Sequence, residues 1–262
     1  MVSDTARGRF VWYDLMTTDP QAAVAFYGKV VGWGTTQWDG GGQGQPYTMW
    51  TVGESPIGGV MALPDNLKQM NVPPHWMAYI GTPNVDATIE QAKALGANVM
   101  MPPMDIPTVG RFAVLSDPQG ATFSVFTALA DAPGHDGPPR IGEFSWHELA
   151  TTDYAGAFGF YSRLFGWEKT DEMDMGPAGT YLMYGRGPMP LGGIFRKPDE
   201  MPGPPSWLYY ARVPDVNAAV ENVKANGGQV LNGPMEVPGG DWIAQCMDPQ
   251  GGMFAIHQTK AA

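Results

Sequence analysis

The 262-residue chain contains a single cysteine, Cys246, and comparatively few basic residues. One cysteine excludes an internal disulfide and a zinc site built from several thiolates. With 15 Lys and Arg against 26 Asp and Glu, the net charge is −11. A negative surplus of this size repels phosphate backbones and anionic lipids, so we expect neither nucleic acid nor a membrane as a partner.

Long apolar runs are also missing from the sequence. No stretch reaches the length of a membrane-spanning helix, and the first residues do not show the basic and then apolar pattern of a secretion signal. These two observations together predict a cytoplasmic location. Apolar residues make up 44% of the chain, which is typical of a soluble globular protein.

The most prominent feature that is present is an internal repeat. Residues 10–33 (FVWYDLMTTDPQAAVAFYGKVVGW) and 144–167 (FSWHELATTDYAGAFGFYSRLFGW) match without a gap at an offset of 134, and 11 of the 24 positions are identical. Chance at ordinary composition gives about one or two identities. Further matches follow at the same offset and, after a three-residue slip, at 131: Tyr47/Tyr181, Gly58-Gly59/Gly192-Gly193, Trp76/Trp207, Tyr79/Tyr210 and Asp117-Pro118-Gln119-Gly120/Asp248-Pro249-Gln250-Gly251.

A repeat of this length predicts a duplicated domain. We place the first domain at residues 1–130, a linker rich in Gly and Pro at 131–140, and the second domain at 141–262. If the duplication fused the two chains of an ancestral dimer, the product is a monomer with pseudo-dimeric domains. A homodimer of the whole chain is the alternative.

Each copy divides again into two modules of the form βαβββ. In the first module, Phe10–Met16 has the alternation and aromatic content of a strand. Asp19-Pro20 then supplies a helix cap followed by proline at the first helical position. Strands are predicted at residues 35–38, 47–52 and 57–63. The second module repeats the scheme, with a strand at 75–80, a helix capped by Asn84, and strands at 97–100, 111–115 and 122–127.

Paired βαβββ modules, with D-x-x-x-A-x-x-F-Y-x-x-x-x-G-W early and D-P-x-G before the last strand, resemble the vicinal oxygen chelate superfamily of glyoxalases, bleomycin-resistance proteins and extradiol dioxygenases. The first motif reads from Asp19 to Trp33 and from Asp153 to Trp167. The resemblance implies an α+β fold of two tandem glyoxalase-like domains, each a curved mixed sheet around a small-molecule cavity.

The resemblance also implies where a divalent metal would bind. The family pattern falls on three residues in each copy: Trp12, Met77 and Ser124, and then Trp146, Leu208 and Ala255. None of these side chains is a good ligand for Mg, Mn, Fe or Zn. We therefore expect no cofactor. The alternative is a divalent metal at a displaced site, with Glu148 and His257 as its leading ligands.

Strand alternation selects further side chains on the expected cavity faces. Asp14 and Glu148 are the candidate catalytic bases, and the alternative is that they are buried carboxylates bonded to backbone or tyrosine groups. The expected substrate-binding residues are Trp12, Met77, Tyr79, Trp146, Leu208, Tyr210, Arg212 and His257.

Three functions are compatible with these residues. The first is a glyoxalase-like lyase or isomerase that acts on a small oxygenated metabolite by acid–base chemistry. The second is a non-catalytic protein that binds a drug or metabolite, as bleomycin-resistance proteins do. The third is an interaction protein with vestigial pockets. In the first two, the partner is a small molecule.

Overall fold

The computed structural model describes residues 6–40 and 47–260, and it confirms two tandem glyoxalase-like domains of the α+β class. The first copy contains β1 (Phe10–Thr17), α1 (Pro20–Val30), β2 (Gly34–Trp38), β3 (Tyr47–Val52), β4 (Ser55–Ala62), α2 (Asp65–Gln69), β5 (His75–Gly81), α3 (Val85–Ala94), β6 (Asn98–Ile106), β7 (Gly110–Ser116) and β8 (Thr122–Ala128). The second contains β9 (Phe144–Thr151), α4 (Tyr154–Phe165), β10 (Glu168–Asp174), η3 (Gly176–Ala178), β11 (Thr180–Arg186), β12 (Met189–Arg196), β13 (Ser206–Arg212), α5 (Val216–Ala225), β14 (Gln229–Glu236), β15 (Trp242–Met247) and β16 (Met253–Gln258).

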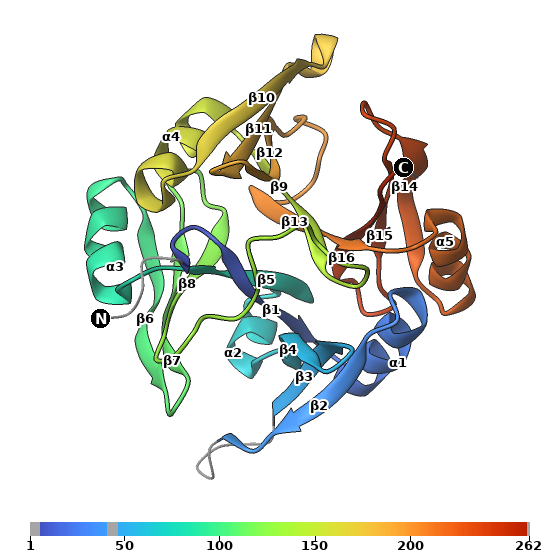
Figure 1. The fold of residues 1–262 in the computed structure, drawn as a ribbon, viewed down its shortest axis with the longest axis horizontal. Helices are drawn as coiled ribbons and strands as arrows, with labels where there is room; N and C mark the ends of the chain where they lie inside the picture. The colour runs from blue at the N-terminus through green and yellow to red at the C-terminus, as the bar shows by residue number, and fades with distance from the viewer. Residues whose placement is uncertain (1–5, 41–46, 261–262) are drawn as a thin grey trace. The chain divides into compact units, whose positions relative to one another are not determined.

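Each copy forms one eight-stranded mixed sheet (Figure 1). The strand order is β2-β3-β4-β1-β5-β8-β7-β6 in the first copy and β10-β11-β12-β9-β13-β16-β15-β14 in the second. Within each module the first strand runs parallel to the last, as β1 does with β4 and β13 does with β16. The other pairs inside a module are antiparallel, as in β2–β3 and β3–β4. The predicted βαβββ modules are therefore confirmed.

The chain divides into two compact units, and each unit combines one module from each copy. Unit 1 comprises Met1–Trp12, Met77–Gly137 and His147–Trp207. Unit 2 comprises Tyr13–Trp76, Pro138–Trp146 and Leu208–Ala262. The second module of copy one thus packs with the first module of copy two, and the two remaining modules pack together.

In unit 1, α3 and α4 lie side by side (Figure 1), and the Gln91 side chain donates to the Arg163 carbonyl between them. Beneath the helices, the Asp117 carboxylate accepts hydrogen bonds from its own turn at Gln119 and Ala121. Its second oxygen accepts from the hydroxyl of Tyr161, a residue of the other copy, at 3.0 Å. The D-P-x-G turn of copy one is therefore bonded to the F-Y motif of copy two.

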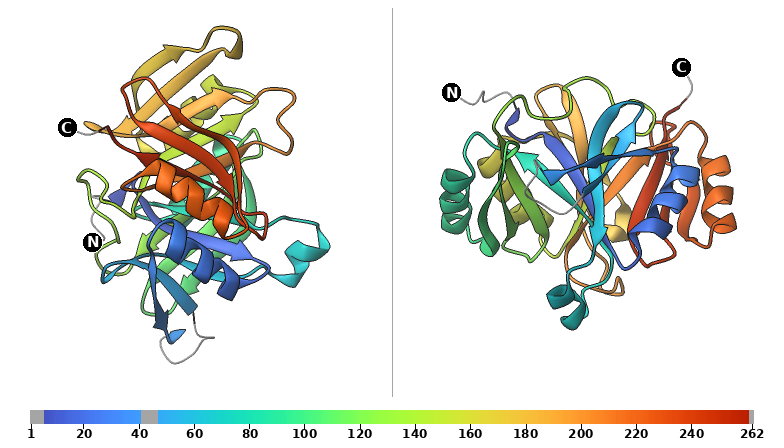
Figure 2. Two further views of the ribbon diagram at one scale, coloured as in Figure 1. Left: turned by 90° about the vertical axis from the view of Figure 1, so that its right-hand side faces the viewer. Right: turned by 90° about the horizontal axis from the view of Figure 1, so that it is seen from below.

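Unit 2 contains the equivalent arrangement. Helices α1 and α5 lie side by side in both views of Figure 2, and Lys29 bonds to Asn226 across the pair. The Tyr27 hydroxyl donates to Asp248 at 3.0 Å and accepts from the Trp76 indole, also at 3.0 Å. The recurring motifs thus have a structural use, because each F-Y tyrosine holds the turn of the other copy.

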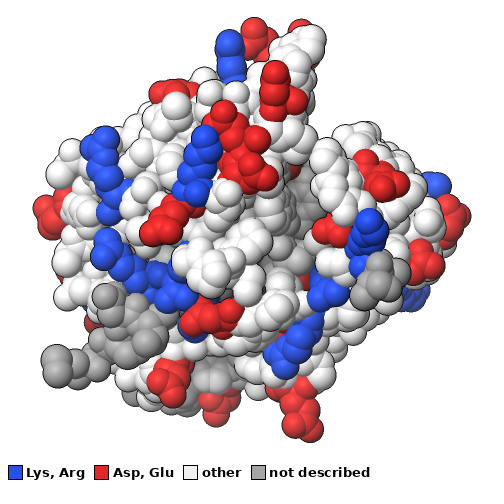
Figure 3. All heavy atoms as spheres, turned by 45° about the horizontal axis from the view of Figure 1, so that its top comes forward, with Lys and Arg blue, Asp and Glu red and all other residues white. Residues whose placement is uncertain are grey.

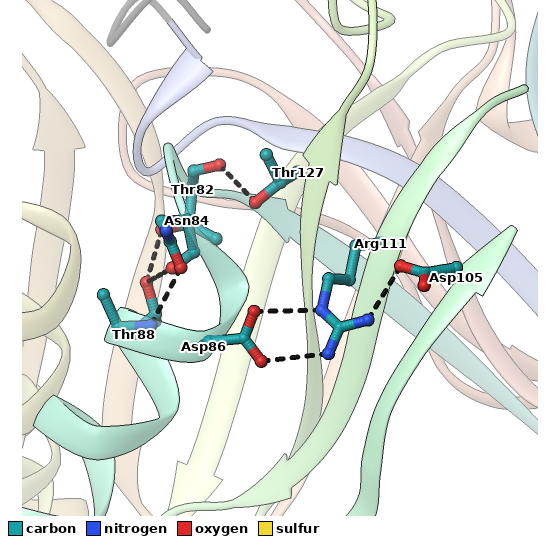
Figure 4. Close-up of polar contacts among 8 residues, drawn as sticks. Thr82, Asn84, Asp86, Thr88, Asp105, Arg111 and Thr127 are labelled. Atoms are coloured by element: carbon teal, nitrogen blue, oxygen red, sulfur yellow. Dashed lines mark hydrogen bonds and ion pairs between the residues drawn. The ribbon is translucent and has the colours of Figure 1, made fainter. Parts of the chain in front are cut away.

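Helix starts follow the sequence closely. The side chains of Asp19, Asn84, Asp153 and Asp215 each accept a hydrogen bond from a backbone N–H in the first turn of the following helix. Figure 4 shows the α3 cap, where Asn84 accepts from the Ala87 N–H.

The same view shows how α3 is joined to the β6–β7 hairpin. Arg111 on β7 forms a two-pronged ion pair with Asp86, at 3.0 Å on both arms, and a third bond to Asp105 (Figure 4). These hydrogen bonds lower the pKa of Asp86. The ion pair is exposed, so it orients the hairpin rather than adding much stability.

Two elements of copy one differ from the sequence prediction. The strand expected at residues 97–100 continues to Ile106 through Pro102-Pro103, with shifts of register on both sides of Met101. β6 is the edge strand of its sheet, and an edge strand with bulges tolerates proline because its outer N–H groups need no partner. The short helix α2 was not predicted. None of its residues is buried, so the sequence has no apolar periodicity at this segment that would indicate a helix.

No helix within residues 6–40 and 47–260 combines the length and the apolar character that crossing a membrane requires. On the face drawn in Figure 3, Lys and Arg side chains are interspersed among Asp and Glu side chains. The expected absence of a nucleic-acid partner stays a prediction.

Candidate functional site

Glu148 forms a hydrogen-bonded pair with Tyr181 in unit 1. Glu148 lies half-buried on β9, and Tyr181 lies near the start of β11. The Tyr181 hydroxyl donates to Glu148 Oε2 at 2.8 Å. A hydrogen bond to an ionised carboxylate is stronger than a neutral one, so the tyrosine fixes the orientation of the carboxylate.

Asp14 and Tyr47 form the equivalent pair in unit 2. Asp14 is buried on β1, with 3% of its surface exposed, and it accepts a hydrogen bond from the hydroxyl of Tyr47 at the start of β3. The two pairs are related by the offset of 134. Both copies therefore place a tyrosine hydroxyl on the candidate base.

A glycine next to each pair makes this arrangement sterically feasible. Gly59 is the register partner of Asp14, and Gly193 is that of Glu148. A Cβ atom at Gly59 would lie 1.9 Å from the Tyr47 hydroxyl oxygen, and one at Gly193 would lie 2.1 Å from the Tyr181 ring. Each tyrosine crosses its glycine to reach the carboxylate. The repeated Gly-Gly and Tyr positions were visible in the sequence, but their role as partners of Asp14 and Glu148 was missed.

The residues at the family's metal positions do not fit a divalent metal. In copy one the Ser124 hydroxyl donates to the Met77 sulfur at 2.8 Å. In copy two the matching positions are Leu208 and Ala255, which have no donor atoms in their side chains. Within the described ranges, no group of three or more His, Cys, Asp or Glu residues is arranged to hold a metal ion. The expectation that the protein has no cofactor stays a prediction.

The part of copy two in unit 2 carries a polar chain that the sequence did not predict. His257 on β16 is nearly buried, and its Nδ1 lies 2.7 Å from the Ser145 hydroxyl. Its Nε2 lies 3.0 Å from Asp241 Oδ2. The Ser145 hydroxyl also lies 3.2 Å from the Tyr210 carbonyl oxygen.

Two predicted substrate-binding residues, Tyr210 and Arg212, belong to the same unit as these hydrogen-bonded side chains. The Tyr210 hydroxyl accepts from the Gln245 amide at 2.9 Å. Arg212 donates through Nη2 to the Thr259 hydroxyl at 2.7 Å and through Nη1 to the Pro139 carbonyl. Its Nε is buried and has no hydrogen-bond partner among the residues that the structure describes.

The corresponding part of copy one is apolar. Val11, Tyr79, Phe126 and Ala128 form a buried cluster in unit 1, and the partly buried Trp12 packs against it. Counting back by the offsets, Val11 stands where copy two has Ser145, and Phe126 stands where it has His257. The two copies therefore offer different chemistry. Sequence reasoning singled out His257 and Arg212 in copy two, but it did not identify Ser145 or Asp241 as partners of His257.

The displaced metal site with Glu148 and His257 as ligands, and the role of Arg212 in substrate binding, stay predictions. Glu148 belongs to unit 1, whereas Arg212 and His257 belong to unit 2. Trp146 is a half-buried residue of β9 that falls in unit 2. Cys246 is fully buried, and this burial raises the pKa of its thiol to about 12, so it is an unreactive core residue at neutral pH.

Comparison with known proteins gives one consistent result. The sequence profile described as "Glyoxalase/Bleomycin resistance protein/Dioxygenase superfamily" matches residues 9–125 and 140–256. The chain is 32% identical to "Putative glyoxylase CFP32" of Mycobacterium bovis, over 97% of this chain and 96% of the relative. It is 29% identical to "Anthracycline biosynthesis protein DauV" of a Streptomyces species, over 98% of this chain and 95% of the relative.

Solved structures share the fold at low sequence identity. The Mn(II)-bound glyoxalase from Novosphingobium aromaticivorans superposes with a TM-score of 0.65 at 17% identity, covering 96% of this chain and 82% of that one. Homoprotocatechuate 2,3-dioxygenase from Arthrobacter globiformis superposes with a TM-score of 0.67 at 14% identity, covering 97% and 80%. At these identities the likeness concerns the fold alone.

Proposed function

The chain belongs to the glyoxalase/bleomycin resistance protein/dioxygenase superfamily, and from this we propose that it is a glyoxalase-like lyase or isomerase of a small oxygenated metabolite. Glu148 and Asp14 serve as the bases of acid–base chemistry. The observation that carries the proposal is the repeated carboxylate–tyrosine pair, Glu148–Tyr181 and Asp14–Tyr47. The name of the relative CFP32 supports the glyoxalase-like class.

In this proposal the carboxylate takes a proton from the carbon beside a carbonyl group and returns it to a neighbouring atom. A base is effective when it is held within hydrogen-bond reach of that proton. Tyr181 and Tyr47 supply this orientation by donating to their carboxylates. The isomerisation consumes no oxidant and no water, because the proton that leaves one atom is delivered to the next.

The proposed proton transfer uses no metal ion. The side chains at the family's metal positions are apolar, or are paired with each other as Ser124 and Met77 are. The leading alternative ligand, His257, has both ring nitrogens within hydrogen-bond distance of protein atoms. A metal at His257 would have to displace Ser145 or Asp241.

A second candidate function is non-catalytic binding of a drug or metabolite, as in bleomycin-resistance proteins. The apolar cluster of copy one favours it, because Trp12, Tyr79 and Phe126 form an apolar and aromatic group in the part of copy one where copy two has ionisable groups. A small molecule is the partner under both functions, without nucleic acid or membrane. The domain limits 1–130 and 141–262, the linker between them and the cytoplasmic location remain part of the proposal.

The test is turnover of a panel of 2-oxoaldehyde hemithioacetals, followed by absorbance of the thioester product. Glu148→Gln and Asp14→Asn remove one base each while keeping its size. We expect one of them, or both, to lower kcat at least about 100-fold, the usual contribution of a general base. Tyr181→Phe and Tyr47→Phe are the matched controls for orientation, with smaller losses. Full activity in the double variant Glu148→Gln/Asp14→Asn would reject both assignments.

A further inference from the structure

We propose that Ser145, His257 and Asp241 form a nucleophilic acyl-transfer site in the second copy, directed at small carboxylic esters or thioesters. The three residues come from β9, β16 and the loop before β15, and all lie in unit 2. Ser145 Oγ lies 2.7 Å from His257 Nδ1, and His257 Nε2 lies 3.0 Å from Asp241 Oδ2. This activity is independent of Glu148 and Asp14.

Asp241 fixes the orientation of the His257 imidazole. Asp241 Oδ1 accepts the Lys260 backbone N–H at 2.8 Å, which leaves Oδ2 directed at the histidine. A carboxylate oxygen accepts hydrogen bonds, so the contact of Asp241 Oδ2 with Nε2 favours the tautomer with hydrogen on Nε2. Nδ1 is then an acceptor for the Ser145 hydroxyl, whose single hydrogen is shared with the Tyr210 carbonyl oxygen at the longer distance of 3.2 Å.

This arrangement defines which atom can react. Both ring nitrogens of His257 lie within hydrogen-bond distance of protein atoms, so the imidazole itself is not free to attack a substrate. The atom of the Ser145–His257–Asp241 group that can attack is the Ser145 hydroxyl oxygen. Ser145 is partly exposed, whereas His257 is 9% exposed. A hydroxyl bonded to a base that is itself oriented by a carboxylate is the signature of an activated nucleophile, recognised by geometry and not by sequence order.

The chemistry balances without any further reagent except water. Ser145 Oγ bonds to the carbonyl carbon while its proton passes to His257 Nδ1. The bond to the leaving alcohol or thiol then breaks, and that group departs with the proton from His257. Water, deprotonated by the same nitrogen, releases the carboxylic acid and regenerates the serine.

Arg212 adds a permanent positive charge on the same side of the sheet. Arg212 and His257 are register partners on the neighbouring parallel strands β13 and β16, so their side chains leave the same face. A fixed cation favours the negative charge that develops on the carbonyl oxygen during attack.

Copy one supplies a natural comparison, because it has none of the three groups. At the repeat offsets Ser145 corresponds to Val11, His257 to Phe126 and Asp241 to Gly110. Val11 and Phe126 pack in the same apolar cluster. Ser145→Val and His257→Phe therefore introduce residues that the same fold already accommodates at the equivalent positions.

The test is covalent labelling of the whole folded protein with a fluorophosphonate, read by intact mass and by mapping of the modified peptide. We expect one phosphonyl group per chain, attached to Ser145. Ser145→Ala and Ser145→Val abolish the adduct, and His257→Phe slows its formation at least about 100-fold. Asp241→Asn slows it similarly, because the amide can donate to Nε2 and select the tautomer that no longer accepts from Ser145. Ser206→Ala, at an exposed serine at the start of β13, labels like the wild type.

The wild-type reaction alone is decisive. No adduct on folded wild-type protein at millimolar probe overturns the proposal, and so does an adduct mapped to any other residue. Equal labelling rates in wild type and His257→Phe would show that His257 does not activate the Ser145 hydroxyl, and this result also overturns the proposal. Thermal unfolding of each variant confirms that lost labelling is not lost folding. Glu148→Gln should label normally, so this test and the test of the proposed isomerase fail separately.

Discussion

His147 shows what the sequence does and does not reveal at the scale of single residues. It sits beside Glu148 and resembles a site residue, but strand alternation turns it to the opposite face of β9, where it is buried. In the structure its ring stacks on Phe10 with centroids 3.7 Å apart and planes 5° apart. Its Nδ1 lies 2.8 Å from the Leu191 carbonyl oxygen. The pair at the equivalent repeat positions, Tyr13 of copy one and Phe144 of copy two, also stacks, with ring centroids 4.0 Å apart and planes 29° apart.

Burial lowers the pKa of His147 to about 4, and this makes stability depend on pH. The folded-state pKa lies below the unfolded value of about 6.5, so the stabilisation is complete above pH 6.5 and is lost as pH falls towards 4. We expect the free energy of unfolding to drop by about 2 kcal/mol from this residue between pH 7.5 and pH 5. Urea denaturation at both pH values measures the drop.

His147→Phe keeps a ring on Phe10 and removes the titrating group, so its drop between the two pH values should be smaller by that amount. Tyr13→Phe, the equivalent position of copy one, has no group that titrates in this window and serves as control. Identical pH dependence in wild type and His147→Phe would contradict the assignment of a buried neutral imidazole.

At the scale of elements, the repeat motifs act in pairs drawn from different copies. Asp117 is buried, and desolvation raises its pKa, while its bonds to Ala121, Tyr161 and Gln119 act in the opposite direction. Removing the tyrosine hydroxyl leaves a buried carboxylate with one partner fewer. Sequence reasoning identified Asp117 as part of a turn and Tyr161 as part of a helix, but spacing along the chain carries no information about a bond between copies.

We expect Tyr161→Phe to lower the free energy of unfolding by about 1.5–3 kcal/mol, the range for a hydrogen bond to a charged group. Tyr27→Phe, which breaks the equivalent bond to Asp248, should have a similar effect. Tyr154→Phe, a half-buried tyrosine at the start of the same helix as Tyr161, is the control. Urea denaturation of the three variants checks this, and a Tyr161→Phe curve matching that of Tyr154→Phe would disprove the role.

Local signals explain why most elements were predictable. Caps such as Asp19 and Asn84 and the alternation of β1 and β5 depend on neighbouring residues alone. The continuation of β6 through Pro102-Pro103 does not, because only the position of that strand at a sheet edge makes proline acceptable. The bonding of Asp14 and Glu148 to tyrosine hydroxyls was the alternative that the sequence offered, but the sequence did not identify Tyr47 and Tyr181 as the partners, since each pair joins residues 33 positions apart.

At the scale of the whole molecule, the copies in the sequence and the compact units in space do not coincide. Each unit contains one module of each copy, so either copy alone lacks half of both units. We expect separately produced residues 1–130 and 141–262 not to form folded monomers. Co-expression should return a folded complex, because the bonds Tyr27–Asp248 and Tyr161–Asp117 require both copies.

Size-exclusion chromatography and near-UV circular dichroism of the separate and combined halves measure this. The full chain is the reference. A monomeric half with a cooperative thermal transition and native near-UV signal would show that the modules of one copy suffice, against the pairing of modules in the two units.

The measurement that tests the central claim most directly is the metal dependence of turnover. The protein is treated with a chelator, its metal content is checked by elemental mass spectrometry, and the rate with the methylglyoxal–glutathione hemithioacetal is measured with and without added Mn, Fe, Ni or Zn. Because the residues at the family's metal positions do not fit a divalent metal and the carboxylate–tyrosine pairs remain, the expected rate is the same in every sample and is lost in Glu148→Gln/Asp14→Asn. Activity that disappears with the chelator and returns with one metal would contradict the account.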